Sequence, residues 1–387
     1  MKRFPTTGLL LLLLTTACAR GPESPAPRTA ATRDRYQDDV LRSDLAGGPA
    51  YREWSAAAHR ALRDRLSIKP SFKEILYFLP ETATAVGYRL ELRRGQRLQV
   101  DIDRRMSGRV FAEVFEEIGG GEPIFRLVRT LPSSESHLSF EATTDGPHVV
   151  RLQPEMFKSG QVVVTITTTA SLTFPVFGKS TRAIGSVFGD PRDGGQRDHE
   201  GIDIFAPAGT DVLAVAPGII RTVNSTTLGG NVVWQEDPVR HVSYYYAHLT
   251  EQKVRRGDHV AAGDVVGTVG NTGNARTTPS HLHFGVYKPG RVAIDPVPFI
   301  FNQPSDPVQP VLVDLNALGQ ARYLDGARVL RTTPAGEAVP TLAASSSQPV
   351  TIIGAVREWY RVMLSDGTQG FVRARDIATD FSSKASH

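Results

Sequence analysis

Apolar residues alternate with polar ones over long stretches of the chain, and this period of two constrains the fold more than any other feature. The clearest runs are Tyr88, Leu90 and Leu92, then Leu98, Val100 and Ile102, then Val110, Ala112 and Val114. Residues at i and i+2 share one face of a strand, so these runs predict half-buried strands. Gly (35) and Pro (26) are also frequent, which favours turn-rich β structure over a helical bundle. We therefore predict a mainly β protein with antiparallel sheets and short helices near the N-terminus.

A chain of 387 residues is long enough for two or three domains. We expect a signal peptide over 1–17, a flexible tether over 19–34, a helical segment over 35–68, a β-sandwich accessory domain over 72–178, a Gly-rich β domain over 180–300, a Pro-rich hinge over 301–311 and a small β unit over 312–378. The helical segment is predicted to break at Gly47-Gly48-Pro49. After the break, Tyr51, Trp54, Ala58, Leu62 and Leu66 form an amphipathic stripe that predicts a core or docking surface.

The first residues of the chain have the pattern of an export signal. Lys2 and Arg3 precede an apolar run from Leu9 to Leu14, which is far shorter than a membrane-spanning helix. Cys18, the only cysteine, follows Thr-Thr-Ala and resembles the lipidated cysteine of a bacterial lipoprotein box. The resemblance implies a lipid-anchored protein of the cell envelope. Arg20, rather than Asp, favours the outer membrane, facing the periplasm. A plain secretory signal with an incidental cysteine is the alternative.

The charge balance excludes a strongly cationic nucleic-acid binder. The 44 basic and 40 acidic residues give a formal net charge of +4, and two of the basic residues lie in the export signal. The chain also has no Lys/Arg-rich block interleaved with aromatic residues. We therefore expect no nucleic-acid partner.

Histidines and one carboxylate cluster between residues 199 and 283. His281 and His283 would face one cavity if they lie on a strand, with Leu282 on the other side. His199 and Asp203 are four residues apart, and by the alternation rule Tyr244, Tyr246 and His248 should share a face. Two imidazoles and one carboxylate suit tetrahedral zinc with an open position for water. The same donors also form the facial triad of non-haem iron oxygenases, although that triad usually has His-x-Asp/Glu spacing and would leave two histidines over.

Ordered motifs across about 120 residues make the chemistry more specific. They are Ser186-Val-Phe-Gly189, His199-Glu-Gly-Ile-Asp203, Ala206-Pro-Ala-Gly-Thr210, Tyr246-Ala-His248-Leu249, Gly267-Thr-Val-Gly270-Asn-Thr-Gly273, His281-Leu-His283-Phe284 and Asp295-Pro296. Together they resemble the lysostaphin-type (LytM-like) zinc metalloendopeptidases. The resemblance implies an antiparallel β-sheet with a narrow groove, and one zinc ion per chain. It also implies that His199, Asp203 and His283 are zinc ligands and that His248 and His281 are catalytic.

The function implied by the resemblance is hydrolysis of peptide bonds in peptidoglycan stems or cross-links, for cell-wall remodelling. Glu200 is followed by Gly-Ile-Asp rather than by the spacing of a His-Glu-x-x-His motif, so histidines would have to move the protons. A catalytically silent adaptor that activates another wall hydrolase is the alternative. Such adaptors lose their ligands, whereas all five positions are intact here.

The C-terminal unit carries its own resemblance. Trp359-Tyr-Arg-Val362, a turn at Ser365-Asp-Gly367, and Gly370-Phe-Val372 resemble a bacterial SH3-like domain. Such domains commonly bind cell-wall peptides or partner proteins, so an envelope protein is a possible partner of residues 312–378. A small barrel without a ligand is the alternative.

Overall fold

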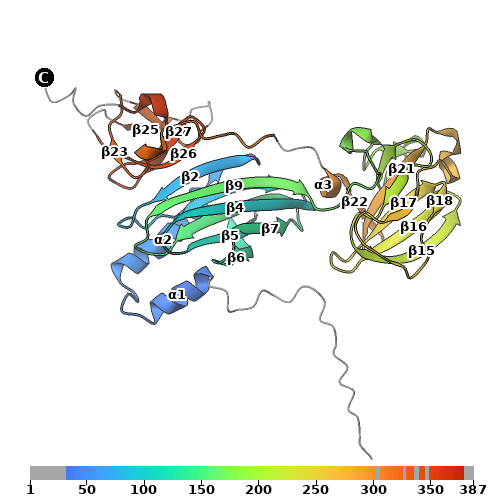
Figure 1. The fold of residues 1–387 in the computed structure, drawn as a ribbon, viewed down its shortest axis with the longest axis horizontal. Helices are drawn as coiled ribbons and strands as arrows, with labels where there is room; N and C mark the ends of the chain where they lie inside the picture. The colour runs from blue at the N-terminus through green and yellow to red at the C-terminus, as the bar shows by residue number, and fades with distance from the viewer. Residues whose placement is uncertain (1–31, 302–305, 326–327, 335–339, 345–347, 379–387) are drawn as a thin grey trace, which may run out of the picture.

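The computed structural model describes residues 32–301, 306–325, 328–334, 340–344 and 348–378, and it is mainly β, as predicted. Figure 1 shows three parts: a central unit (residues 32–170), a histidine unit (171–301) and a C-terminal unit (306–378). The predicted signal peptide, Cys18 and most of the predicted tether lie outside the described residues. Within the described ranges, no helix has the length and apolar character needed to cross a membrane.

Two helices open the described chain. Helix α1 (Arg33–Leu41) begins after Thr32, and helix α2 (Pro49–Arg63) begins at a proline, which suits the first helical position. The helices are interrupted over residues 42–48, so the predicted Gly47-Gly48-Pro49 lies at the end of the interruption, with Pro49 as the first residue of α2. Trp54 of α2 is buried and donates a hydrogen bond from its indole to the Pro154 carbonyl at 2.8 Å. The predicted stripe therefore packs against strands of the same unit, but α2 ends at Arg63 and Leu66 lies in a short strand instead.

Two antiparallel-rich sheets pack face to face in the central unit. One contains, in spatial order, β1 (Leu66–Ser67), β3 (Val86–Leu92), β8 (Gly146–Pro154), β5 (Val110–Ile118) and β6 (Ile124–Leu131). The other includes β2 (Phe72–Phe78), β9 (Gly160–Ala170), β4 (Gln96–Met106) and β7 (His137–Glu141). The alternating residues predicted to point inward, from Tyr88 to Val114, belong to one apolar core shared by both sheets.

The second sheet does not end at β2 but continues into the C-terminal unit. Its further strands are β26 (Val350–Val356), β27 (Trp359–Met363), β28 (Gln369–Arg373), β24 (Arg328–Arg331) and β25 (Pro340–Ala344), with β23 (Ala321–Arg322) beside β26. Strand β26 pairs with β2 at Ile75 and Leu76. Beneath this pairing, fully buried Glu74 accepts hydrogen bonds from Arg361 at 2.7 and 2.9 Å and from the Tyr88 hydroxyl at 2.7 Å. Main-chain pairing and a buried ion pair thus join the two units.

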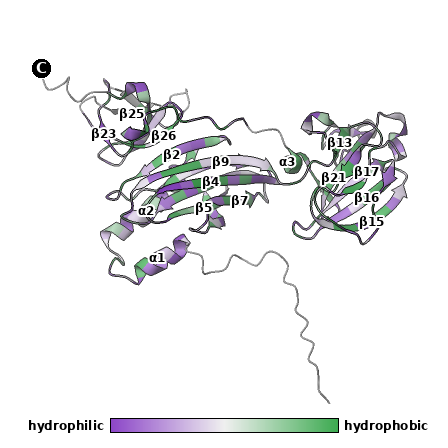
Figure 2. Ribbon diagram, in the orientation of Figure 1, coloured by the Kyte–Doolittle hydropathy of each residue, from purple (hydrophilic) through white to green (hydrophobic). Residues whose placement is uncertain are grey.

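The histidine unit is built on an eight-stranded sheet. Its order is β10 (Ile184–Ser186), β13 (Ile202–Phe205), β21 (His281–Lys288), β17 (Val242–Leu249), β16 (Gly230–Asp237), β15 (Gly218–Thr226) and β19 (His259–Val260), with β22 (Val292–Ile294) beside β21. A smaller sheet contains β14 (Asp211–Leu213), β20 (Val265–Thr268) and β18 (Glu251–Gln252), and β11 (Pro191–Arg192) pairs with β12 (Arg197–Asp198). Short 3-10 turns lie at Thr181–Ala183, Asp193–Gly195 and Gly273–Thr277 here, and at Leu315–Ala317 and Ala374–Asp376 in the C-terminal unit. Hydrophobic and hydrophilic residues alternate along the strands (Figure 2). One face of the large sheet therefore packs in the core, and the other face lines a groove and can carry a functional site.

A compact joint connects the histidine unit to the central unit. Arg240, in the turn between β16 and β17, donates two hydrogen bonds of 2.8 Å to Glu141 of β7. Helix α3 (Val297–Ile300), which lies between the two units in Figure 1, places Phe299 against the turn at Gly95. Gly95 has a φ of 85°, and a Cβ there would lie 2.4 Å from the Phe299 ring. The predicted turn at Arg94-Gly95 is therefore also a docking point.

Candidate metal centre

Three of the predicted ligands converge on the polar face of the large sheet. Asp203 of β13 and His283 of β21 are paired in register, and Asp203 Oδ1 lies 3.1 Å from His283 Nδ1. His199 precedes β13, and its Nε2 lies 3.1 Å from Asp203 Oδ1 and 3.0 Å from His283 Nδ1. Gly201, between the first two ligands, lacks a Cβ that would stand 2.8 Å from the His283 ring. The sheet therefore gathers donors that are 80 residues apart in the chain.

The hydrogen bonds of His199 leave its metal-facing nitrogen with a lone pair. Nδ1 lies 2.8 Å from the carbonyl oxygen of Val187, which can only accept, so Nδ1 carries the proton. When the ring carries this one proton, Nε2 has a lone pair directed toward Asp203 and His283. This is the outer-shell arrangement that usually orients a metal-binding histidine.

Arg192 holds the second oxygen of Asp203. Its guanidinium donates to Asp203 Oδ2 at 2.7 Å and to Ser186 Oγ at 2.6 Å, which leaves Oδ1 turned toward the two histidines. Burial alone would raise the pKa of Asp203, but the neighbouring imidazoles of His199 and His283 outweigh it and hold that pKa well below its usual range. Asp203 is therefore a carboxylate at neutral pH.

The donor set fits zinc. Within the ranges that the structure describes, His199, Asp203 and His283 form a group whose ligand atoms all lie within 4.8 Å of one another. Donors about 2.1 Å from a tetrahedral ion are about 3.4 Å apart, close to the separations seen here. Two imidazoles and one carboxylate are also the donors of catalytic zinc sites that keep a fourth position open.

The two histidines predicted to be catalytic lie beside this group. His248 and His281 have ring centroids 5.0 Å apart, and His281 Nε2 is 3.9 Å from Asp203 Oδ1. His248 Nδ1 donates to the Thr272 carbonyl and His281 Nδ1 to the Pro279 carbonyl, each at 2.9 Å. Both rings thus keep Nε2 available as a base or, when protonated, as a donor.

Burial and neighbouring imidazoles keep His248 neutral. Burial, with smaller effects from His281 and His283, lowers the pKa of His248 to about 4. Burial also lowers the pKa of His283. His248 is therefore neutral at neutral pH, and its Nε2 carries a lone pair.

The prediction that Tyr244, Tyr246 and His248 share a face is wrong. Both tyrosines are fully buried on the core side, where their hydroxyls donate to Asp237 and Gln235 at 2.7 Å. His248 reaches the opposite face because β17 carries a bulge against β16 at this point, and His248 itself adopts a φ of 62°. A bulge inserts one extra residue and reverses the alternation that follows it.

A groove of about 770 Å³ opens over the centre, and its wall includes residues that the sequence analysis missed. Trp234 of β16, Tyr245 of β17 and Tyr287 of β21 lie side by side on it, with the Trp234 and Tyr245 ring centroids 4.4 Å apart. Arg192 and Arg291 also line the groove. Tyr245 lies between the two buried tyrosines in the sequence, and this alternation was the signal that could have identified Tyr245 as a groove residue.

A His-His-Asp donor set with two further imidazoles lies at the floor of an open groove on an antiparallel sheet, an arrangement that can bind a divalent metal and activate water for hydrolysis. Residues 197–296 match the profile described as Peptidase family M23, and the chain therefore contains an M23 peptidase domain.

The similar proteins include an L-Ala–D-Glu endopeptidase from Bacillus subtilis, which is 34% identical over 33% of this chain and 42% of its own length. The peptidoglycan DD-endopeptidase ShyC from Vibrio cholerae is 35% identical over 24% of this chain and 21% of its own. The chain thus spans less than half the length of these relatives. The solved catalytic domain of lysostaphin from Staphylococcus simulans is 32% identical, covering 30% of this chain and 90% of that domain with a TM-score of 0.28.

Proposed function

We propose that this protein is a zinc-dependent endopeptidase that hydrolyses peptide bonds in peptidoglycan. The observation that carries the proposal is the convergence of His199, Asp203 and His283 beside two further imidazoles. The M23 match over 197–296 supports it, and so do relatives named for endopeptidase activity on peptidoglycan.

One zinc ion per chain would be held by His199 Nε2, Asp203 Oδ1 and His283 Nδ1. Bound zinc supplies a Lewis acid that polarises a carbonyl oxygen and lowers the pKa of a bound water toward about 7. The remaining work belongs to side chains of this protein.

His248 and His281 divide the proton work between them. One takes the proton of the attacking water at Nε2, and the other donates from Nε2 to the carbonyl oxygen or to the departing amine. Glu200 is exposed and accepts a hydrogen bond from the Tyr287 hydroxyl at 3.4 Å, so we assign the proton transfers to the two histidines.

The alternatives receive less support. A catalytically silent adaptor would not need all five histidine and aspartate side chains, nor the hydrogen bonds that orient the rings of His199, His248 and His281. The non-haem iron oxygenase considered from the donor set alone is disfavoured by the M23 match.

The location and partners are part of the same proposal. Lipidation of Cys18 would anchor the protein in the cell envelope, at the outer membrane and facing the periplasm, where it meets the wall. The C-terminal unit would contact wall peptides or an envelope protein.

Mass spectrometry of the products from defined peptidoglycan fragments tests the function. We expect new termini within the peptides when zinc is present and intact fragments when a chelator is added. Cleavage that persists unchanged with a chelator would exclude a metallopeptidase.

A further inference from the structure

Three aromatic side chains of the groove, Trp234, Tyr245 and Tyr287, form a surface beside the metal centre that we call the aromatic floor. His283, Gly285 and Tyr287 are i, i+2 and i+4 on this strand, so they share the face that lines the groove. Tyr245 stands opposite Gly285, where a Cβ would lie 2.6 Å from the Tyr287 ring. The glycine thus gives the rings room to form a continuous surface.

Arg291 lies at the far end of this floor. It is exposed in the turn between β21 and β22, and its guanidinium carbon is 5.9 Å from the centre of the Trp234 ring. The Trp234 ring is 5.0 Å from Tyr287 and 4.4 Å from Tyr245, which in turn contacts His283 at 5.8 Å. A chain of ring contacts therefore connects Arg291 to a metal ligand.

No carboxylate of the described residues forms an ion pair with Arg291, so its charge is available to a ligand. The groove wall as a whole also favours anions. It is lined by Arg192, Arg197 and Arg291 against two carboxylates, Glu200 and Asp203, and Asp203 already pairs with Arg192. A divalent ion at the centre would add to this positive excess.

We propose that Arg291, seated over Trp234, binds a carboxylate of the substrate, so that the groove takes an anionic peptide rather than a neutral one. The inference rests on the proposed peptidase function and names the class of peptide that the site accepts. From His283 to Tyr287 the strand rises about 13 Å. Trp234 lies on β16, two strands from His283, so Arg291 would meet a substrate residue several positions away from the bond that is cleaved.

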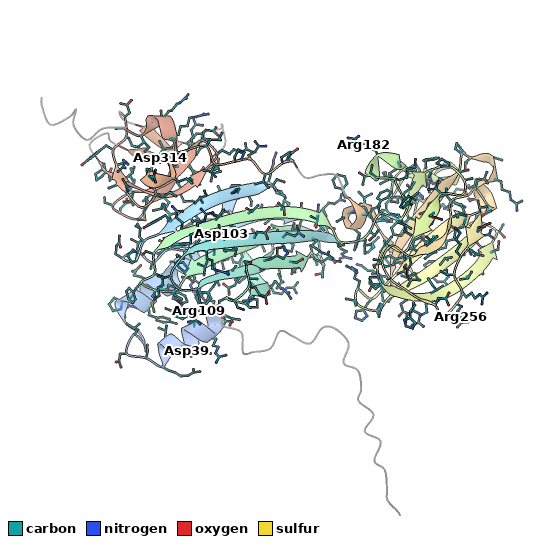
Figure 3. The ribbon with its side chains drawn as sticks, viewed as in Figure 1. Asp39, Asp103, Arg109, Arg182, Arg256 and Asp314 are labelled. Atoms are coloured by element: carbon teal, nitrogen blue, oxygen red, sulfur yellow. The ribbon has the colours of Figure 1, made fainter. Side chains whose placement is uncertain are left out.

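The test measures kcat and KM on the full chain loaded with zinc, for three probes: a muropeptide with free peptide carboxylates, the same muropeptide with carboxamides, and pentaglycine with both termini blocked. We expect a KM about tenfold lower for the free acid than for the carboxamide, since charge-assisted hydrogen bonds are about twice as strong as neutral ones. Arg291→Gln should raise the KM of the free acid about tenfold, leave that of the carboxamide within twofold and leave kcat unchanged. Arg256→Gln is the matched control, because Arg256 is an exposed arginine outside the groove lining (Figure 3).

Equal KM values for acid and carboxamide in the native chain would overturn the inference, as would a preference for pentaglycine or full discrimination in Arg291→Gln. If none of the probes is cleaved, the proposed function fails for them, and calorimetric Kd values of the same probes then decide on Arg291. The same tenfold difference in Kd, lost in Arg291→Gln, would support the carboxylate site, and equal Kd values would refute it.

Discussion

Asp203 and His283 lie directly opposite each other on the antiparallel strands β13 and β21, with Asp203 Oδ1 3.1 Å from His283 Nδ1. Two of the three proposed ligands are therefore positioned by main-chain pairing within a sheet and not by loops. His199 completes the group from the segment just before β13. Such a preformed site should bind its metal with little rearrangement of the backbone.

Removing one ligand should remove the metal. We expect His283→Ala to lose zinc binding and peptide cleavage together, because two donors are too few for a stable site. Metal content by elemental mass spectrometry and cleavage of purified peptidoglycan measure the two effects. His259→Ala, which changes an exposed histidine outside the groove, should keep both. Stoichiometric zinc in His283→Ala would contradict the ligand assignment.

Zinc should also stabilise the fold. A ligand that binds only the native state at a hundredfold excess over its Kd adds about 2.7 kcal/mol to the free energy of unfolding. We therefore expect a chelator to lower the Tm of the native chain and added zinc to restore it. The same titration on Asp203→Ala should give no shift. A Tm that responds equally in both chains would place the zinc elsewhere.

His248 combines a functional side chain with a costly backbone conformation. We expect His248→Ala and His248→Gly to keep zinc and lose turnover, since His248 is not among the three ligands. His248→Gly should be the more stable of the two by about 1 kcal/mol, because glycine adopts the positive φ at this position without a steric penalty. Urea unfolding measures the difference. An alanine variant as stable as the glycine variant would show that the bulge carries no strain.

Arg192 should act as a positioning residue for the metal centre. Its removal frees Asp203 Oδ2, so we expect Arg192→Ala to weaken zinc affinity about 10- to 100-fold, the usual effect of losing an outer-shell partner. Competition with a chromogenic chelator measures the affinity directly. Arg182→Ala, an exposed arginine outside the groove lining, is the control and should bind zinc as the native chain does. An unchanged affinity in Arg192→Ala would limit its role to surface charge.

The joint between the histidine unit and the central unit should be sensitive to acid. Burial raises the pKa of Asp237, but hydrogen bonds from Arg240 and Tyr244 outweigh it and leave that pKa lowered. A lowered pKa in the folded state means that the stabilisation is present above about pH 4, near the unfolded value, and is lost as the pH falls through the folded value.

We expect Arg240→Ala to cost about 2–3 kcal/mol at pH 7, because it leaves Asp237 buried without its partner and breaks the contact with Glu141. The cost should shrink below pH 4, and urea unfolding across this range measures it. Arg221→Ala is the comparison. Its partner Glu236 is more exposed than Asp237, so this substitution should cost less than about 1 kcal/mol. An equal cost at both ends of the pH range would contradict the role of Asp237.

The central unit shows how far the pattern of residues predicts the fold. The period of two placed Tyr88, Leu98 and Val114 on inner faces, and the structure confirms these positions. The pairing of β2 with β26 was not predicted, because the strands are separated by more than 270 residues. The sequence of an edge strand does not indicate which strand it will pair with. The residues of the buried Glu74–Arg361 pair likewise appear unrelated until the strands meet.

In the histidine unit, the spacing of His281 and His283 was enough to predict that both side chains lie on the same face of a strand, and both line the groove. That prediction held because a regular strand obeys a local rule. The position of His248 depends instead on a bulge, which arises from how β17 registers against β16. The aromatic floor and Arg291 likewise come together only when β16, β17 and β21 lie side by side. Local periodicity is a property of the chain, whereas strand order and register are decided by burial of the whole core.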